Sequence, residues 1–462
     1  MLNILLQNVE DINTLEKAAM EIACKYMELF LQLLEKKLFE EKPGHYKVLR
    51  IIPRTIATRL GEIKYKRRYY KNTKTGEKVF LLDEALGIRK GKRVSGEMLK
   101  LLVTLANKLT FRQAEEVIKD AGYPSLSHAT IHKEVREFGE EESKRVEHER
   151  EKIFTEGKNN ITEKEQQKNP EILFLEADGI MLSSQEENER RMEVKVGLMH
   201  EGWTYSTPAR KRRKLINPTV VCGVYRNAEE FWEEFSAEIA RRYRLEDTIV
   251  VLNGDGARWI QKRAKEYFPD IIVQLDRYHI KRDLRRHFGK EVADDMFEVL
   301  AEGRKKTFLD TLESLAYAEE KAETKRKKLK LVKHYRRYTD HLLDYRKRLP
   351  SKIDKKNLYG MGAIEGYVGK IIARRMKNQG MSWSRDGAEA MVKILMLSQH
   401  KNLRVRLSDK KYTIENPVKK IKKKIKNTNR DWQEWLKARM PALRGPASGK
   451  NWVKALRSTV TV

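Results

Sequence analysis

The stretch "VVLNGDGARWIQKRAKEYFPDIIVQLDRYHI" (residues 250–280) contains two apolar runs, and each run stops at an aspartate. Asp255 ends the first run and Asp276 ends the second, and a helical pattern lies between them. Short apolar runs that alternate with helices are typical of buried parallel strands. A carboxylate at the end of a buried strand is costly unless it has a partner. The stretch therefore predicts an α/β sheet that carries acids at its strand ends.

The segments before this stretch extend the predicted sheet. "EILFLEADGIML", "RMEVKVGLMHEGW" and "PTVVCGVYR" are strand candidates, and "NAEEFWEEFSAEIARRYRL" is an amphipathic helix with Asn227 as its N-cap. Three strands, helix, strand, helix and strand together predict a mixed sheet, with the later strands parallel. The charged, apolar-poor residues 140–170 predict a solvated helix and a linker, so we expect a domain boundary near Asn169.

The segments after this stretch are helical. Residues 281–354 contain almost no strand signal and predict a helical insertion, and helix resumes at about Ala363. The sheet domain is therefore expected to consist of residues 171–280 and 355–400. The basic tail, residues 401–462, fits an auxiliary DNA-binding segment and an ordinary solvated end equally well.

The N-terminal region has a different texture. Residues 1–50 carry apolar side chains at helical spacing, whereas residues 51–93 alternate apolar and polar side chains around the turn sequence "NTKTGE". This pattern predicts N-terminal helices and then a β-hairpin with a basic face. Arg67 and Arg68 precede two tyrosines there, a mixture that suits contact with DNA phosphates and bases. The alternative is a solvated edge strand.

Residues 94–150 predict a helix-turn-helix. A helix from Arg112, a turn at Ala121–Pro124 and a second helix capped by Ser127 would place that second helix in the major groove of DNA. A helical hairpin that never touches DNA can have the same pattern. The predicted DNA-contacting residues of the second helix are Ser127, His128, Thr130, His132 and Lys133.

Composition favours a nucleic-acid partner. The chain has 462 residues, and its 97 Lys and Arg exceed its 67 Asp and Glu to give a net charge of +30. A surface this positive attracts polyanions, although a ribosome-associated protein or a charge-rich, thermophile-like surface would also have it. There are two cysteines and no Cys-x-x-Cys pair, so a thiolate zinc site is not expected. No apolar stretch approaches the roughly 20 residues that span a membrane, so we expect a soluble, cytoplasmic protein without a membrane partner.

Three acids are candidate metal ligands. Asp178 lies in the first strand of the sheet region, with Glu176 on the same face, and Asp255 ends a later strand between two glycines. Glu365 lies near the start of a helix that also carries glycines at 366 and 369, which leave room for a large partner. Carboxylates at strand and helix ends suit Mg²⁺ or Mn²⁺, and two such ions can hold the attacking and leaving oxygens of a phosphoryl transfer. The alternatives are a helix cap for Asp255 and a surface ion pair for Glu365.

The order of these motifs resembles a known family. "LEADGIML", "LNGDGARWI", "LDRYHI", a helical block and "GAIEGYVGKIIARRMKNQGMSWSRDGAEAM" follow one another as in the ISLre-type insertion-sequence transposases. These enzymes belong to the Mutator-like DDE class, which has a ribonuclease-H-like catalytic core. The N-terminal "RLGEIKYKRRYY" and "VFLLDEALGI" also resemble that family, so the resemblance covers nearly the whole chain.

The resemblance implies a function and a site. Asp178, Asp255 and Glu365 match the catalytic, metal-binding triad, expected to hold two Mg²⁺ or Mn²⁺ ions, and Asp276 and His279 match an Asp-x-x-His signature of the class near the site. The expected partners are double-stranded DNA, as terminal inverted repeats and as target, and further copies of the chain in a dimer or larger assembly. The expected location is the bacterial nucleoid. The role of the signature, and whether Glu176 assists, stay open.

Two other functions remain possible from the sequence. A domesticated DNA-binding protein would keep the fold without transposing, and a ribonuclease-H-like nuclease or resolvase would cut DNA without strand transfer. The intact triad disfavours the first, and the predicted helix-turn-helix disfavours the second.

Overall fold

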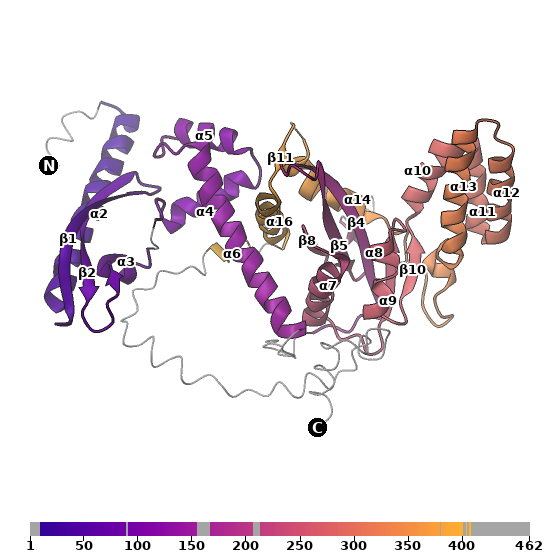
Figure 1. Ribbon diagram of the computed structural model, residues 1–462, viewed down its shortest axis with the longest axis horizontal. Coiled ribbons are helices and arrows are strands. Elements are labelled where there is room, and N and C mark those ends of the chain that lie inside the picture. The colour runs from indigo at the N-terminus through magenta and orange to yellow at the C-terminus, as the bar shows by residue number, and fades with distance from the viewer. Residues whose placement is uncertain are drawn as a thin grey trace, which may run out of the picture. The chain divides into compact units, whose positions relative to one another are not determined.

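Figure 1 shows the computed structural model of the chain, which describes residues 10–88, 91–154, 167–206, 213–378, 380–400, 403, 406 and 407. These residues form two compact units. The N-terminal unit runs to Gly139, and the C-terminal unit runs from Glu140 to His400. The division falls within helix α6 (His128–Phe154) rather than near Asn169.

The N-terminal unit begins with one long helix and a small sheet. Asp11 caps α2 (Ile12–Glu41) by accepting the backbone N–H of Thr14 at 2.7 Å. The sheet has the order β1-β2-β3, and its strands are antiparallel. They are β1 (Tyr46–Ala57), β2 (Glu62–Asn72) and β3 (Lys78–Val79), followed by the short helix α3 (Leu81–Ala85).

The turn predicted at "NTKTGE" is confirmed, but the longer hairpin before it was not predicted. "NTKTGE" joins β2 to the short β3, whereas the two long strands turn between Thr58 and Gly61. Thr58 donates its backbone N–H to the Gly61 carbonyl at 2.9 Å, and Gly61 has φ of +148°, a conformation that glycine adopts more readily than other residues. The first strand starts at Tyr46, before residue 51, where the β-hairpin region was expected to begin.

Two helices and the first part of a third complete this unit: α4 (Gly96–Ala106), α5 (Phe111–Asp120) and α6 up to Gly139. The side chains of Ser95 and Thr110 cap α4 and α5 by accepting a backbone N–H from the first turn of each helix. The Ser127 hydroxyl accepts the backbone N–H of Thr130 at 3.3 Å at the start of α6. The predicted helix, turn and helix are confirmed, and their contact with DNA stays a prediction.

The C-terminal unit is built on a mixed sheet, as predicted. The strand order is β10-β9-β4-β5-β8. The central β4 pairs antiparallel with β5, which pairs antiparallel with β8; β4 also pairs parallel with β9, and β9 with β10. The strands are β4 (Ile172–Ser184), β5 (Arg191–His200), β8 (Thr219–Gly223), β9 (Ile249–Gly254) and β10 (Ile272–Leu275), with β11 (Ser382–Trp383) added at the end of β4 and a separate pair formed by β6 (Trp203–Tyr205) and β7 (Arg213–Leu215).

Alternation along β4 decides which side of the sheet receives the acids. Leu173 and Leu175 pack into the larger core, which contains aromatic residues of α7 (Ala228–Arg242) and apolar residues of α8 (Arg258–Gln261) and α9 (Ala264–Tyr267). Phe174 instead packs with Tyr345 and Met361 on the opposite side. Because side chains alternate along a strand, Glu176 and Asp178 share the side of Phe174.

Four helices form the predicted insertion after β10. They are α10 (Arg277–Phe288), α11 (Lys290–Glu302), α12 (Lys305–Tyr317) and α13 (Ala322–Arg337), and they lie together and share an apolar core (Figure 1). "RYHI" was predicted to continue the strand, but α10 already begins at Arg277 because the Asp276 side chain caps it. The short 3₁₀ helices η2 (Thr339–His341) and η3 (Tyr345–Lys347) follow α13.

The last part of the C-terminal unit returns to the sheet. It contains α14 (Ala363–Tyr367), the π-helical segment η4 (Val368–Ala373), α15 (Arg374–Met376) and α16 (Arg385–Gln399). Of the basic tail, only Leu403, Arg406 and Leu407 fall within the described residues. Across the described chain, no helix combines the length and apolar character needed to cross a membrane.

Candidate functional site

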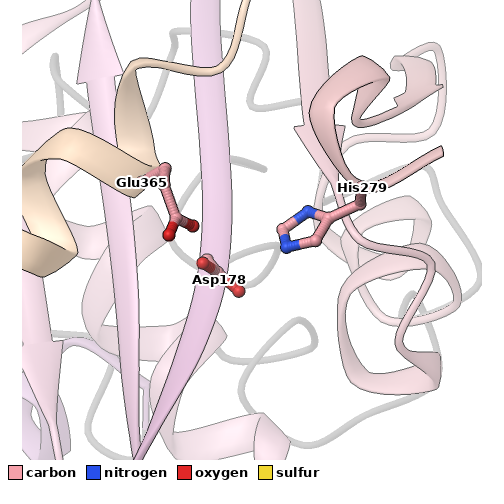
Figure 2. A group of neighbouring side chains, drawn as sticks. All are labelled: Asp178, His279 and Glu365. Carbon is pink, nitrogen blue, oxygen red and sulfur yellow. The ribbon is translucent and has the colours of Figure 1, made fainter. Parts of the chain in front are cut away.

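Three side chains from distant segments converge on the acid-bearing side of the sheet. Asp178 on β4, His279 on α10 and Glu365 on α14 each have a potential ligand atom, and these atoms lie within 4.8 Å of one another (Figure 2). Asp178 and His279 are buried, whereas Glu365 is exposed. The group is therefore anchored in the protein on two sides and open on the third.

Asp255 lies next to this group but does not belong to it. The parallel register pairs Ala177 with Gly254, so Asp255 follows β9 at the level of Asp178. Its side chain is exposed and accepts the backbone N–H of Ala257 at 2.8 Å. This bond makes a local turn before α8, but the N-cap of that helix is Ala257 and no side chain caps it, so Asp255 is not the helix cap of the alternative. That Asp255 binds metal stays a prediction.

The environment of Asp178 disfavours its negative charge. Burial raises the pKa of this carboxyl to about 6, and the charges of Asp255 and Glu365 add to the rise. The backbone N–H of Gly179, at 2.8 Å, and the nearby His279 oppose it. A bound cation would remove this penalty, so the site is electrostatically suited to one.

His279 is held in place by Asp276. One carboxylate oxygen of Asp276 accepts the backbone N–H of His279 at 3.0 Å and lies 3.5 Å from its Nδ1. Burial would lower the pKa of His279, but the Asp276 carboxylate and the charge of Asp178 raise it above its ordinary value. The Asp-x-x-His spacing thus places the aspartate at the helix cap and the histidine in the first turn, inside the site.

A buried chain of hydrogen bonds fixes Asp276 in turn. Asn253 donates to its second carboxylate oxygen at 2.5 Å, Gln274 donates to Asn253 at 3.0 Å, and the backbone N–H of Tyr345 donates to Gln274 at 2.8 Å. Burial would raise the pKa of Asp276, but its bonds from His279 and Asn253 lower it. The histidine therefore rests on polar groups from β9, β10 and η3.

Glu176 supports the site from behind rather than contributing a ligand. It is fully buried, and its carboxylate accepts the backbone N–H groups of Gly362, Ala363 and Ile364 at 2.9, 3.2 and 3.1 Å. These are the otherwise unpaired donors at the start of α14. Glu176 thereby fixes the helix that carries Glu365.

The predicted DNA-binding arginines of β2 are engaged within the N-terminal unit. Arg67 is largely buried, is paired with Asp83 and lies over the Phe80 ring at 3.6 Å. Burial and the neighbouring Arg54 lower the pKa of Arg67 to about 10. Arg68 is more exposed and pairs with Glu35 at 3.4 Å. The structure does not leave Arg67 available for the DNA contact expected of it, because its charge is needed inside the unit.

The start of α6 holds the other predicted DNA-binding residues. His128 is bound to Glu115 of α5 through its backbone N–H and its Nδ1, both at 2.8 Å, and the His132 ring packs edge-on against Phe111 at 4.9 Å. The turn between the two helices is therefore fixed by side chains. Lys133 is exposed, and Ser127 and Thr130 bond to each other.

Two carboxylates and an imidazole are a ligand set that suits one divalent cation. Carboxylates suit Mg²⁺ and Mn²⁺, whereas the imidazole favours Mn²⁺ and later transition metals over Mg²⁺. A ligating histidine commonly has a carboxylate near its other ring nitrogen, and the Asp276 carboxylate lies 3.5 Å from Nδ1 of His279. Within the described ranges, this is the one group of three such residues that could share an ion.

Comparison with known proteins gives a family. The profile of "Uncharacterised protein family (UPF0236)" matches residues 4–411. A "UPF0236 protein in vanSb 3'region" of Streptococcus gallolyticus is 29% identical over 81% of this chain and 78% of its own length. A UPF0236 protein of Caldanaerobacter subterraneus subsp. tengcongensis, whose name joins four locus labels, is 26% identical over 87% of this chain and 81% of its own length. Another from that organism, with eleven locus labels in its name, is 26% identical over 86% and 79%. The chain therefore belongs to the uncharacterised family UPF0236.

Proposed function

We propose that this protein is a DNA transposase of the DDE class, which cleaves the ends of an insertion sequence and joins them to target DNA. The observation that carries the proposal is the convergence of Asp178 and Glu365 from segments far apart in the chain, with Asp255 on the adjacent strand. Because the sequence resembles the ISLre-type insertion-sequence transposases, the proposal includes that the chain is a transposase of that type.

The proposal includes a ribonuclease-H-like core. Its support is the arrangement of the sheet, in which three antiparallel strands precede two strands parallel to the first. The acids come from the central strand, from the end of its parallel neighbour and from a helix on one side, and the four-helix insertion separates the second acid from the third.

Each residue has a distinct task in this reaction. A divalent cation held by Asp178, Glu365 and, for a second ion, Asp255 would supply charge that stabilises the transferred phosphoryl group. His279 would complete or orient this ligand set, and Glu176 would position Glu365. Water attacks the phosphodiester at the element end, and the bond breaks to give a 3′-hydroxyl on the element and a 5′-phosphate on the flanking strand. That 3′-hydroxyl then attacks a phosphodiester of the target, forms a new phosphodiester with its phosphorus and releases a 3′-hydroxyl of the target strand. The protein forms no covalent bond to DNA in either step.

The partner is proposed to be double-stranded DNA. The excess of cationic residues gives non-specific attraction to phosphate, and the helices α5 and α6 would read the inverted repeats. A relative whose name joins eleven locus labels fits a gene that occurs in many copies in one genome. Joining two ends requires at least two active copies, so a dimer or larger assembly is expected on DNA.

The test uses labelled duplexes that carry the inverted repeats flanking the gene, incubated with the full chain and Mg²⁺ or Mn²⁺. Cleaved and joined products are expected for the wild type. Asp178→Asn and Asp255→Asn should each abolish both products while DNA affinity stays within several-fold of the wild type. Asp270→Asn, an exposed aspartate outside the site, is the matched control and should remain active.

The outcomes separate the alternatives. Binding without cleavage by the wild type would favour a domesticated DNA-binding protein. Cleavage without joining would favour a nuclease or resolvase. Full activity of Asp255→Asn would remove Asp255 from the proposed metal site.

A further inference from the structure

The C-terminal unit contains a pocket of about 580 Å³. One side comes from α8 and α9, which directly follow Asp255, and the other comes from the end of α13 and from η2. It is lined by Arg258, Gln261, Lys262, Lys265, Arg337, Tyr338, Asp340 and His341.

Its positive charge is not balanced by nearby acids. Arg258, Lys262, Lys265 and Arg337 are exposed, and within the described chain none of them pairs with a carboxylate. Asp340 is the acid of the lining, and its carboxylate lies 2.9 Å from the Lys305 amine. Four cations therefore face one space with their charge available to a ligand.

Two buried polar side chains in the lining also lack partners. Gln261 is 2% exposed, and neither its amide nitrogen nor its amide oxygen has a hydrogen-bond partner among the described residues. His341 is 9% exposed, and its Nδ1 is unpartnered in the same sense. Burial and the positive charges of Lys265 and Arg348 lower the pKa of His341 to about 4, so its ring is neutral at pH 7. Unpaired buried polar groups are costly, and a ligand with both donors and acceptors would satisfy them.

Ring contacts lead from the pocket lining to the turn that follows Asp255. The His334 ring of α13 lies so close to Gly256 that a Cβ at that glycine would be 2.6 Å from its Nε2. His334 contacts the Tyr338 ring edge-on at 5.2 Å, and Tyr338 stacks on His341 at 5.6 Å. A row of rings thus connects the pocket to the turn after Asp255, the acid proposed to bind the second ion.

We propose that this pocket binds the phosphate backbone of DNA next to the bond being cut, so that the helices after β9 and the end of the helical insertion both contact the same DNA strand. The inference rests on the proposed function, because that function supplies DNA as the ligand. Exposed cations suit a polyanion that passes through the pocket. A free nucleotide and inorganic phosphate carry the same phosphate group as DNA, so the experiment compares their binding with that of a duplex.

The test measures binding of a short fluorescein-labelled duplex to the full chain, by anisotropy over a range of salt concentrations and without divalent metal. The pocket variant is Lys262→Gln/Lys265→Gln. The matched control is Lys306→Gln/Lys330→Gln, which removes the same charge from exposed positions on α12 and α13 outside the pocket. The pocket variant should bind about tenfold more weakly, and its salt slope should fall by about 2, roughly one for each phosphate that is no longer neutralised. The control should change each quantity much less.

A second variant tests the unpartnered glutamine. Gln261→Met removes a buried polar group without a partner, so the variant should be as stable as the wild type or more stable in urea, yet it should bind the duplex more weakly. Unchanged duplex binding in this variant would count against the proposal.

The inference would be overturned if the two lysine double variants weakened duplex binding equally. It would also be overturned if the pocket bound inorganic phosphate or deoxyadenosine monophosphate tightly while the pocket variants left duplex affinity unchanged. Because the assay contains no metal and needs no cleavage, a wild type that binds through the pocket but never cuts DNA would refute the proposed function alone.

Discussion

Asp178 is buried between other acids, and its pKa of about 6 has a consequence for stability. Between about pH 4 and pH 6 the folded protein keeps a proton on this carboxyl that the unfolded chain has already lost. By linkage, this group's contribution makes the folded state less stable as pH rises through that window.

Asp178→Asn should remove this effect. The variant should gain stability relative to the wild type by about 1–3 kcal/mol as pH rises from 4 to 7, because a shift of one pKa unit corresponds to about 1.4 kcal/mol. Urea unfolding of both proteins at several pH values measures the difference. A difference that stays constant over this range would show that Asp178 is not buried as an acid with a raised pKa.

Glu176 provides a second prediction for a single residue. Glu176→Gln replaces an acceptor of three backbone N–H groups with an amide that must turn a donor toward some of them, so α14 should lose its fixed position. We expect Mn²⁺ affinity, measured by calorimetry, to fall at least about tenfold, a loss of roughly 1.4 kcal/mol, with DNA affinity unchanged.

The exposed Glu171, just before β4, gives the control Glu171→Gln, which should bind Mn²⁺ as the wild type does. If Glu176→Gln also binds Mn²⁺ normally, the buried carboxylate only stabilises the fold. If the wild type binds no Mn²⁺, the metal site itself is wrong.

The sequence predicted that Asp178 and Glu365 come together, but it did not predict the hydrogen bonds that hold the site in place. Strand alternation and helix position are local properties, so they can be read from neighbouring letters. The bonds from α14 to Glu176, and those from Asn253 to Asp276, join segments that only the fold brings together. The sequence also could not show that Arg67 is needed inside its own unit, because its partner Asp83 lies in a later helix.

At the scale of elements, α16 is held to the sheet by a buried charge. Lys393 is 2% exposed, and its amine lies 2.8 Å from both carboxylate oxygens of Glu234 on α7 and 3.1 Å from the Cys222 carbonyl of β8. The amine thus connects two helices and a strand on the antiparallel edge of the sheet.

Lys393→Met should destabilise the protein by about 3–5 kcal/mol, since it leaves the Glu234 carboxylate buried without its partner. The double variant Lys393→Met/Glu234→Met should recover much of this loss. Urea unfolding of the two single variants and the double variant gives the coupling between the residues. Additive losses would mean that the ion pair contributes little.

Most elements were predictable because hydrophobic periodicity is a local signal. The strands around Asp178 and Asp255 and the helical insertion lie where the pattern put them. The errors came at boundaries: "RYHI" has apolar residues that suit a strand, but the Asp276 cap starts a helix there. The longer hairpin was missed because "NTKTGE" is the stronger turn sequence, although it joins β2 to the shorter strand β3.

At the scale of the whole molecule, a net charge of +30 predicts strongly salt-dependent DNA binding. If six or more phosphates are contacted, affinity for any duplex should fall about 10³-fold or more between roughly 50 and 200 mM salt, as counterions are released. Anisotropy titrations at several salt concentrations give the slope. A slope near zero would mean that this charge does not serve DNA binding.

The bonds between Glu176 and the start of α14 span 186 to 188 residues of sequence. During synthesis the ribosome must therefore deliver the whole helical insertion before this carboxylate meets its donors, and closing so large a loop slows the last step of folding. A nascent or prematurely terminated chain could already hold Asp178 and Asp255 and still lack a complete site. If the protein cuts DNA as proposed, a fragment that ends before α14 lacks Glu365 and the donors that Glu176 binds, and should therefore not cleave.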